Sequence, residues 1–368
     1  MKVLIVSAYA LPHVGGIEVV VAQQAQSLAE LGHEVTVFTS SAGATTGRQY
    51  VDGYCIVRND VWNGLERWGV PFPVWGSSAL ARLIRLVRAS DVVHVHDTSY
   101  QSSVVASLLT KLLHRRLLIT QHVGMVEHNN PAVRWLQLGA YATYGRLLWS
   151  WASGITVYNP IVQRFLTDHR VPPGKVQLAY NGIDTTYFCP GDAAGMAATR
   201  ANYGLPLEKP LVLFVGRLVH KKGVHRLIEA CDPAYQIVLV GSGSEPDHPE
   251  TVTYLGPVDR QELRSLYQAC DIFVFPAVGE MLTLVMQEAM ACGLPVVATL
   301  ERDYDVYELD PYGIELVPSD SETLRSTFLE ILGDDDHFKY MKDYSRALAE
   351  ERFDWRMNAQ ETAHLYSD

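Results

Sequence analysis

The chain alternates short runs of apolar residues with longer segments in which apolar residues recur every three or four positions. The short runs predict buried strands, and the longer segments predict amphipathic helices. In the first half, a helix is expected from about Gly16 to Leu31, with Gly32 as a stop signal. This alternation is typical of a doubly wound parallel sheet. The strands expected in the first half are residues 3–7, 35–39, 92–96 and 117–120.

The pattern starts again near Pro210, which predicts a second domain of the same α/β class. Turn-forming residues at 172–174, 181–184 and 190–191 separate the two series and predict the linker. We expect one Rossmann-like domain over residues 1–185, another over 186–353, and a ligand cleft where the carboxyl ends of both sheets face each other. The elements expected in the second domain are strands 211–215, 237–240, 272–275 and 296–298 and helices 224–231 and 284–292.

The composition is that of a folded globular protein. Of the 368 residues, 48% are hydrophobic and 19% are charged, which excludes disorder as the main state. The net charge of −11 is unevenly shared, because residues 1–185 carry +4 and the remainder carries −15. The acidic second half argues against nucleic acid as a partner. The mildly basic first half leaves an anionic partner or a membrane surface open.

The sequence predicts a cytoplasmic protein without a disulfide framework. Its five cysteines are odd in number, widely scattered and include no Cys-x-x-Cys pair. The first residues form a strand pattern and not a basic segment followed by a long apolar one, so no secretory signal is expected. Residues 147–163 form the longest uncharged stretch, but Ser, Gly, Asn and Pro interrupt it, so no membrane-spanning helix is expected.

Two glycine-containing loops are candidates for phosphate binding. Gly15 and Gly16 precede a helix whose free N–H groups would attract an anion, although two glycines also form ordinary turns. Arg217 and Lys222 lie five positions apart between an expected strand and an expected helix. There a planar guanidinium and a compact ammonium can hold a diphosphate from two sides. A solvated basic loop is the alternative.

Glu280 and Glu288 lie eight positions apart across an expected strand-to-helix transition. Thr283 is a candidate N-cap of the helix, and the amides of residues 283–285 would face an anion. A loop carboxylate can accept hydrogen bonds from sugar hydroxyls, and a helix carboxylate can bind the diol of a ribose. Ordinary helix glutamates have the same spacing, so the spacing alone does not decide.

Taken together, these motifs resemble the retaining, nucleotide-sugar-dependent glycosyltransferases of family four, which have the GT-B fold. The resemblance covers nearly the whole chain. It implies that a last helix, about residues 354–368, crosses back to pack on the first domain. The motifs that carry the resemblance are Gly15-Gly16, His94-Val95-His96, Thr120-Gln121-His122, Asn181-Gly182-Ile183-Asp184, Gly216-Arg217 with Lys222-Gly223, Val240-Gly241-Ser242-Gly243, Glu280 with residues 288–293, and Phe353-Asp354-Trp355.

The resemblance implies a role for each motif. The donor diphosphate would be bound by the cations and glycine amides, the ribose by Glu288, and the base by backbone near Val258 and residues 241–243. The donor-binding residues expected are Gly15, Gly16, Arg217, Lys222, Gly241, Val258, Glu280, Leu282, Thr283, Leu284 and Glu288. The catalytic residues expected are His122, Glu280, Arg217 and Lys222, with a buried structural histidine as the alternative for His122. The acceptor-side residues expected are His94, His96 and Glu127, although the first two could only shape the cleft.

The activity implied is transfer of a hexose-type sugar, with retention, from a nucleotide diphosphate sugar to an acceptor hydroxyl. UDP is favoured over GDP, and the acceptor is a sugar, a lipid-linked sugar or a small molecule in glycan, polysaccharide or glycolipid synthesis. The resemblance implies same-face substitution, in which a phosphate oxygen takes the acceptor proton, without cofactor or metal. The alternatives are a nucleotide-sugar epimerase or a phosphorylase on the same fold, and a non-catalytic subunit that binds sugar nucleotides.

The sequence departs from the family pattern at two places. Met281-Leu282-Thr283 replaces a Gly-aromatic-Gly/Pro stretch, so we expect a narrower or differently shaped donor pocket. Residues 300–305 replace a Gly-Gly-x-x-Glu stretch and include Asp303 and Asp305. We expect these two aspartates to lie in an exposed loop and to hold no metal.

Aromatic residues are concentrated between Arg134 and Tyr158 and include Trp135, Trp149 and Trp151. Aromatic and arginine side chains suit a membrane interface or a lipid-bearing acceptor. A buried helix of the first domain explains them equally well. The segment is therefore compatible both with peripheral contact at the cytoplasmic membrane face and with a buried helix.

Overall fold

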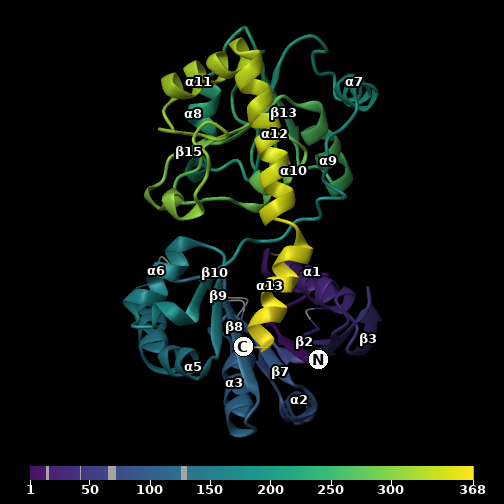
Figure 1. The fold of residues 1–368 in the computed structure, drawn as a ribbon, viewed down its shortest axis with the longest axis vertical. Helices are drawn as coiled ribbons and strands as arrows, with labels where there is room; N and C mark the ends of the chain where they lie inside the picture. Colours follow the sequence, from purple (N-terminus) through teal and green to yellow (C-terminus); the bar gives the residue numbers. More distant parts are fainter. Residues whose placement is uncertain (14–15, 42, 65–71, 126–130, 368) are drawn as a thin grey trace. The chain divides into compact units, whose positions relative to one another are not determined.

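The computed structural model describes residues 1–13, 16–41, 43–64, 72–125 and 131–367. The chain forms two units, Met1–Gly182 with Trp355–Asp368 and Ile183–Asp354 (Figure 1). Each unit is an α/β domain built on a largely parallel sheet, so the predicted fold class is confirmed. The predicted domain boundary at residues 185/186 lies three residues after this division.

The first unit contains an eight-stranded sheet in the order β10-β9-β8-β7-β1-β2-β4-β3. All pairs are parallel except β3 with β4, which form an antiparallel hairpin at one edge. The four strands predicted here are present as β1 (Lys2–Val6), β2 (Glu34–Ser40), β7 (Val92–His96) and β8 (Arg116–Gln121). The additional strands are β3 (Gly47–Val51), β4 (Tyr54–Asn59), β9 (Gly154–Val157) and β10 (Val176–Leu178), and β5 (Val61–Trp62) pairs separately with β6 (Val74–Trp75).

Helices cover both faces of this sheet, because alternate residues of its central strands are buried on opposite sides. Leu4 and Val6 belong to a core that includes residues of α2 (Ser77–Ala89), α3 (Gln101–Leu112) and α5 (Arg146–Trp151). Val3 and Ile5 belong to the core on the other side, with residues of α1 (Gly16–Glu30) and α13 (Trp355–Ser367). The other helical segments described in this unit are α4 (Pro131–Ala140), the π-helical turn η2 (Tyr141–Gly145), α6 (Pro160–Asp168) and the 3₁₀ turn η3 (Pro173–Lys175).

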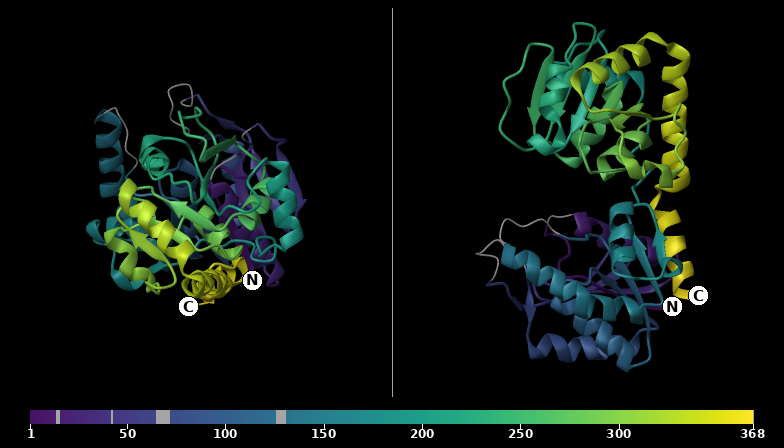
Figure 2. Two further views of the ribbon diagram at one scale, coloured as in Figure 1. Left: turned by 90° about the horizontal axis from the view of Figure 1, so that it is seen from above. Right: turned by 90° about the vertical axis from the view of Figure 1, so that its left-hand side faces the viewer.

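The last helix, α13, completes the first unit although it follows the second unit in sequence. It lies beside α1, as the adjacent purple and yellow helices of Figure 1 show, and both ends of the chain belong to this unit (Figure 2). Asn358 donates a hydrogen bond to the carbonyl of Tyr180 at 2.7 Å. The Trp355 ring covers Gly182 so closely that a Cβ there would lie 2.2 Å from a ring carbon. Gly182 therefore serves the docking of this helix.

The second unit contains a six-stranded, wholly parallel sheet in the order β13-β12-β11-β14-β15-β16. Its four predicted strands are present, and β13 and β16 extend the two edges. The strands are β11 (Leu211–Val215), β12 (Gln236–Val240), β13 (Val252–Gly256), β14 (Ile272–Phe275), β15 (Val296–Thr299) and β16 (Glu315–Val317). The α-helices are α7 (Ala193–Asn202), α8 (Val224–Glu229), α9 (Arg260–Ala269), α10 (Leu284–Ala291), α11 (Ser321–Gly333) and α12 (Asp335–Arg352), and η4 (His220–Lys222) and η5 (Arg302–Tyr307) are short 3₁₀ helices.

The aromatic segment of the first unit contributes both to the core and to the surface. Trp149 is 1% exposed and stacks on Tyr141, with ring centroids 5.8 Å apart. Trp135 is 73% exposed and Leu147 is 48% exposed. The core explanation therefore holds for Trp149, whereas Trp135 belongs to the surface. Within the described ranges, no helix has both the length and the apolar character needed to cross a membrane.

Trp149→Ala should lower the free energy of unfolding by about 3–5 kcal/mol, because it empties a buried aromatic site. The matched control Trp135→Ala removes an exposed ring and should change stability by no more than about 0.5 kcal/mol. Urea unfolding of both variants measures the difference. Equal effects would show that the burial of Trp149 is not what stabilises this core.

Candidate functional site

Four loops of the second unit meet at the carboxyl edge of its sheet. Parallel neighbouring strands end at the same edge, and this edge is where open α/β sheets bind ligands. The loop after β11 carries Arg217 and Lys222, and the loop after β14 carries Glu280. Gly241 follows β12 and Val258 follows β13, so the structure brings most of the predicted donor-binding residues to this one edge.

Glycines allow the backbones of these loops to touch. Gly241 has a φ of 137°, and a Cβ there would lie 1.9 Å from the carbonyl oxygen of Gly216. Gly223 is left-handed with a φ of 73°, and a Cβ there would lie 2.3 Å from the carbonyl oxygen of Pro276. Neither contact tolerates a side chain. The second contact fixes the backbone next to Lys222 against the loop that leads to Glu280.

Lys222 and Glu280 form an ion pair. Lys222 Nζ lies 2.5 Å from Glu280 Oε2 and 5.0 Å from the centroid of the Phe275 ring. The lysine and glutamate side chains are 14% and 27% exposed, so the pair is partly shielded from water. Arg217 on the same loop is exposed, and its side chain has no hydrogen bond or ion pair with any described residue. Of the two predicted phosphate-binding cations, Lys222 is thus paired and Arg217 is available to an anion.

Glu288 lies on α10 and is only partly buried. Its Oε2 accepts a hydrogen bond from the Tyr267 hydroxyl at 3.1 Å. Burial raises the pKa of Glu288 to about 7, against the opposing effects of this hydrogen bond and of Arg260. The carboxyl group is therefore partly protonated near neutral pH and can both donate and accept hydrogen bonds.

The amino terminus of α10 lies at the same edge. Thr283 occupies the N-cap position as predicted, but its side chain makes no capping hydrogen bond, and Oγ1 is buried without a partner among the described residues. Helix geometry leaves the first N–H groups of α10, those of Leu284 and Val285, without intrahelical partners. Together these groups form a set of donors that a bound anion can satisfy.

Met281 and Leu282 are the residues that replace the family's Gly-aromatic pair after Glu280. Their side chains are 5% and 4% exposed, so both are packed inside the second unit. Leu282 reaches this position with a φ of 41°, which is unusual for a residue with a side chain. Gln287 donates a hydrogen bond to the Leu282 carbonyl at 3.0 Å. The departure from the family pattern is thus accommodated by burial of these side chains.

Glu301 is a loop residue to which the sequence assigned no role. Its Oε1 accepts a hydrogen bond from the N–H of Gly279 at 2.6 Å, one residue before Glu280. Asp305 of the nearby Asp303–Asp305 motif is exposed, in the 3₁₀-helical segment Arg302–Tyr307. No group of three or more metal-binding side chains was found in the described part of the chain.

In the first unit, Gly15 and Glu127 lie outside the described residues. Gly16 begins α1 and is exposed, and a Cβ on it would meet open space. No neighbouring atom therefore explains a glycine at this position. His13, the last described residue before this helix, places its Nδ1 2.8 Å from the buried Glu18 carboxylate.

His94 is fully buried and uses both ring nitrogens. Nδ1 lies 2.8 Å from the Tyr366 hydroxyl on α13, and Nε2 lies 2.7 Å from Thr120 Oγ1 on β8. Its position in the core favours the structural alternative over direct contact with an acceptor. Burial lowers the pKa of His94 to about 3, so the ring is neutral at physiological pH.

His96 and His122 lie against each other, with His96 Nδ1 2.9 Å from His122 Nε2. Their rings stack with centroids 5.2 Å apart. Burial lowers the pKa of His122 to about 3 and that of His96 well below its usual value, so both rings are neutral. His122 is only partly buried and keeps Nδ1 without a described partner, whereas His96 is 1% exposed.

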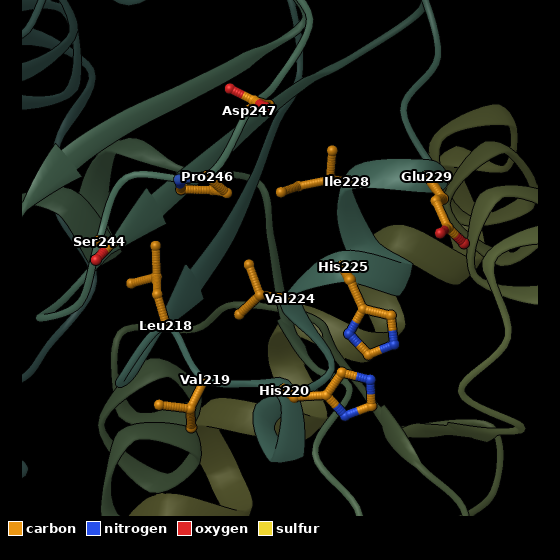
Figure 3. A pocket seen from close by; sticks show the side chains of 10 residues that line it. All are labelled: Leu218, Val219, His220, Val224, His225, Ile228, Glu229, Ser244, Pro246 and Asp247. Atoms are coloured by element: carbon orange, nitrogen blue, oxygen red, sulfur yellow. The ribbon is translucent and has the colours of Figure 1, made fainter.

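A hollow of about 420 Å³ lies beside the Arg217–Lys222 loop, but none of the predicted residues lines it (Figure 3). Its walls are mainly apolar, and the stacked rings of His220 and His225 lie 4.1 Å apart at one side. The lining residues are Leu218, Val219, His220, Val224, His225, Ile228, Glu229, Ser244, Pro246 and Asp247.

Two family models match the chain and together cover most of it. The model described as Glycosyltransferase Family 4 matches residues 14–187, and the model described as Glycosyl transferases group 1 matches residues 196–348. With two Rossmann-like domains, this defines a glycosyltransferase of the GT-B fold. The chain belongs to the family-four glycosyltransferases, as the motifs predicted.

Similar proteins support the same assignment. A D-inositol 3-phosphate glycosyltransferase of Mycobacterium leprae is 30% identical over 77% of this chain and 72% of its own length. The solved structure of HepE from Anabaena in complex with UDP has a TM-score of 0.73 at 19% identity and matches over 100% of both chains. A sucrose-phosphate synthase from Thermosynechococcus elongatus has a TM-score of 0.72 at 22% identity, covering 100% of this chain and 98% of its own. These structures establish the fold.

Removing either partner of the Lys222–Glu280 pair should destabilise the second unit, and the two single effects should add up to more than the effect of removing both. Lys222→Met leaves a partly buried carboxylate unpaired, and Glu280→Gln does the same to the ammonium. Urea unfolding of both single variants and the double variant should give a coupling free energy of about 0.5–3 kcal/mol. Lys221→Met, at the exposed neighbouring lysine, is the control. If the effects of the two single variants simply add up to that of the double variant, the two side chains do not stabilise each other.

Proposed function

We propose that this glycosyltransferase moves a hexose-type sugar, with retention, from a nucleotide diphosphate sugar to an acceptor hydroxyl. The observation that carries the proposal is the unpaired Arg217 guanidinium, which shares one sheet edge with the Lys222–Glu280 pair and the amino terminus of α10. This edge combines a planar cation, a compact cation and free N–H groups, which is the set of donors that a diphosphate requires.

In the proposed complex, Arg217 and the first amides of α10 bind the diphosphate. Lys222 holds Glu280 toward the transferred sugar and adds a second positive charge. Glu288 binds the ribose hydroxyls, for which a carboxyl group with a pKa of about 7 offers both a donor and an acceptor. The Gly241 loop and Val258 frame the base. UDP is the nucleotide we favour, because similar structures contain UDP and UDP-glucose.

The proposed mechanism is same-face substitution. Negative charge grows on the leaving diphosphate, and Arg217, Lys222 and the α10 amides stabilise it without needing to reorganise. A phosphate oxygen takes the proton of the acceptor hydroxyl as the new glycosidic bond forms. His122 would contact outer hydroxyls of the donor sugar through Nδ1, while its Nε2 stays on His96. Gly16 would offer its N–H to the donor from the start of α1.

The acceptor is proposed to be a sugar, a lipid-linked sugar or a small molecule, selected by the first unit. Exposed Trp135 and Leu147 favour an acceptor presented at a membrane surface, because apolar side chains of this kind insert at lipid interfaces. All five cysteines are free thiols, which fits action on the cytoplasmic side. We propose a role in glycan, polysaccharide or glycolipid synthesis.

Arg217→Ala should reduce sugar transfer by roughly 10²–10³, because one transition-state contact to the leaving group is lost. Its melting temperature without ligand should stay unchanged, since the side chain has no described partner. UDP should raise the melting temperature of the wild type and raise it less in the variant. Lys221→Ala, a nearby exposed cation, is the control. Near-wild-type transfer by Arg217→Ala would refute the assignment.

Transfer should continue in excess EDTA. The proposed leaving-group stabilisation comes from Arg217, Lys222 and backbone N–H groups, so chelation of divalent ions should leave the rate within about twofold of the untreated enzyme. Release of nucleotide diphosphate, with and without chelator, measures this. Loss of activity that Mg²⁺ or Mn²⁺ restores would instead direct attention to the loop with Asp303 and Asp305.

A further inference from the structure

Asp97 is a buried carboxyl group at the carboxyl end of β7. It is 1% exposed and has a left-handed backbone with a φ of 57°. A left-handed conformation is unfavourable for a residue with a side chain, and burying a carboxylate is unfavourable without a cation beside it. No basic side chain pairs with Asp97 in the described parts of the chain. The fold thus accepts two separate costs at one position.

The contacts of Asp97 converge on the start of the loop that carries His122. Its Oδ1 accepts hydrogen bonds from the N–H of His122 at 2.9 Å and from the Gln121 side chain at 3.0 Å. The N–H of Val123 lies 3.4 Å from the same oxygen. Oδ2 is buried and has no hydrogen-bond partner among the described residues. The Asp97 carboxyl group therefore binds the Gln121 side chain and the backbone of residues 122–123.

The Gln121 side chain links this arrangement to the core. Its Oε1 accepts a hydrogen bond from Thr98 Oγ1 at 2.9 Å, and Trp149 Nε1 lies 3.4 Å away. The His122 ring is held independently by His96, as described above. The ring and the backbone of His122 are thus held by different residues: His96 binds the ring, and Asp97 binds the backbone N–H.

We propose that Asp97 is a positioning residue for His122, retained for activity at the expense of stability. The inference rests on the proposed function, in which His122 acts on the donor sugar. Asp97 touches neither donor nor acceptor in this scheme, because its carboxyl group is fully buried. It acts by fixing the two peptide groups from which the His122 side chain projects.

The ionisation state of Asp97 gives the proposal a distinctive pH dependence. Burial raises the pKa of Asp97 to about 7, although the N–H groups of His122 and Val123 oppose the shift. The neighbouring titratable groups stay neutral near this pH. Burial lowers the pKa of His96 and His122, and it raises the pKa of Tyr141 to about 12 and that of Tyr100 still further. Asp97 is then the group of this cluster that titrates around neutrality.

Activity and stability should respond to this titration in opposite directions. The ionised carboxylate accepts stronger hydrogen bonds from the loop, so turnover should rise as the pH passes upward through about 7. The folded-state pKa lies above the unfolded value, so the stability contributed by Asp97 is present at low pH and is lost as the pH rises through about 7. A residue that merely stabilised the fold would move both quantities together.

The test is Asp97→Asn in the full-length chain, which preserves shape and removes the charge. We expect turnover at saturating donor to fall roughly 10- to 100-fold at pH 8, while the melting temperature is equal to or higher than that of the wild type. The rise in turnover between pH 6 and pH 8 should also flatten. Saturating donor is needed because Glu288, which also has a pKa of about 7, affects donor binding. Asp52→Asn, at an exposed aspartate with a φ of 45°, is the matched control and should change neither quantity.

Two results would overturn the proposal. Wild-type turnover by Asp97→Asn would show that the loop needs no carboxylate. A lower melting temperature at every pH, with activity lost only in proportion to the unfolded fraction, would make Asp97 a structural residue. If the wild-type chain transfers no sugar from any nucleotide sugar, the proposed function fails and this inference fails with it. A fully active wild type with an equally active variant refutes the role of Asp97 alone.

Discussion

Backbone-to-backbone contact between neighbouring loops determines the geometry of the second unit's ligand edge. At Gly216 and Gly241, and again at Gly223 and Pro276, the chains approach more closely than any side chain would allow. The loops therefore cannot shift independently of the strands that carry them. Lys222 lies next to one of these contacts, and its ion pair with Glu280 spans the two loops that the contact joins. The placement of charge at this edge is thus a consequence of main-chain packing.

The two units differ in the kinds of polar group that they bury. The first unit places neutral imidazoles, hydroxyls and the carboxyl groups of Asp97 and Glu18 in its interior, where they bind one another, a nearby histidine or the backbone. The second unit instead buries the guanidinium of Arg200, which is ion-paired with Asp271, and carries the cations of its β11 loop in an otherwise acidic half of the chain. Positive charge concentrated against a negative background directs an anionic ligand to one place on the surface.

Local pattern predicted the central strands because those strands are buried on both faces and consist of continuous apolar runs. It missed the edge strand β16, whose residues are only half-buried, and the hairpin of β3 and β4, where β3 is largely exposed. The predicted loop motifs of the second unit do lie together, because parallel strands bring their carboxyl ends to one edge. Their pairing was not predictable, since Lys222 and Glu280 lie 58 positions apart.

The environments of individual side chains also depend on residues that are distant in sequence, so local pattern does not predict them. His94 looked like an acceptor-side candidate, but its environment is decided by Tyr366, which lies 272 positions away in the chain. Thr283 has the backbone conformation of an N-cap without the capping hydrogen bond, a distinction that residue type cannot reveal. The sequence does not distinguish Asp97, because an aspartate after a strand is typical of an ordinary turn. Its left-handed φ and its burial become evident only in three dimensions.

The return of α13 to the first unit has a consequence for folding during synthesis. Residues 1–182 leave the ribosome long before residues 355–367, so α1 and one face of the first sheet lack their covering helix while the second unit is being made. During that interval His94 has no Tyr366 hydroxyl to bind, and apolar residues on that face are open to solvent. The amino-terminal unit, although translated first, is the last to be completed, and chaperones would have most reason to bind the nascent chain at this surface.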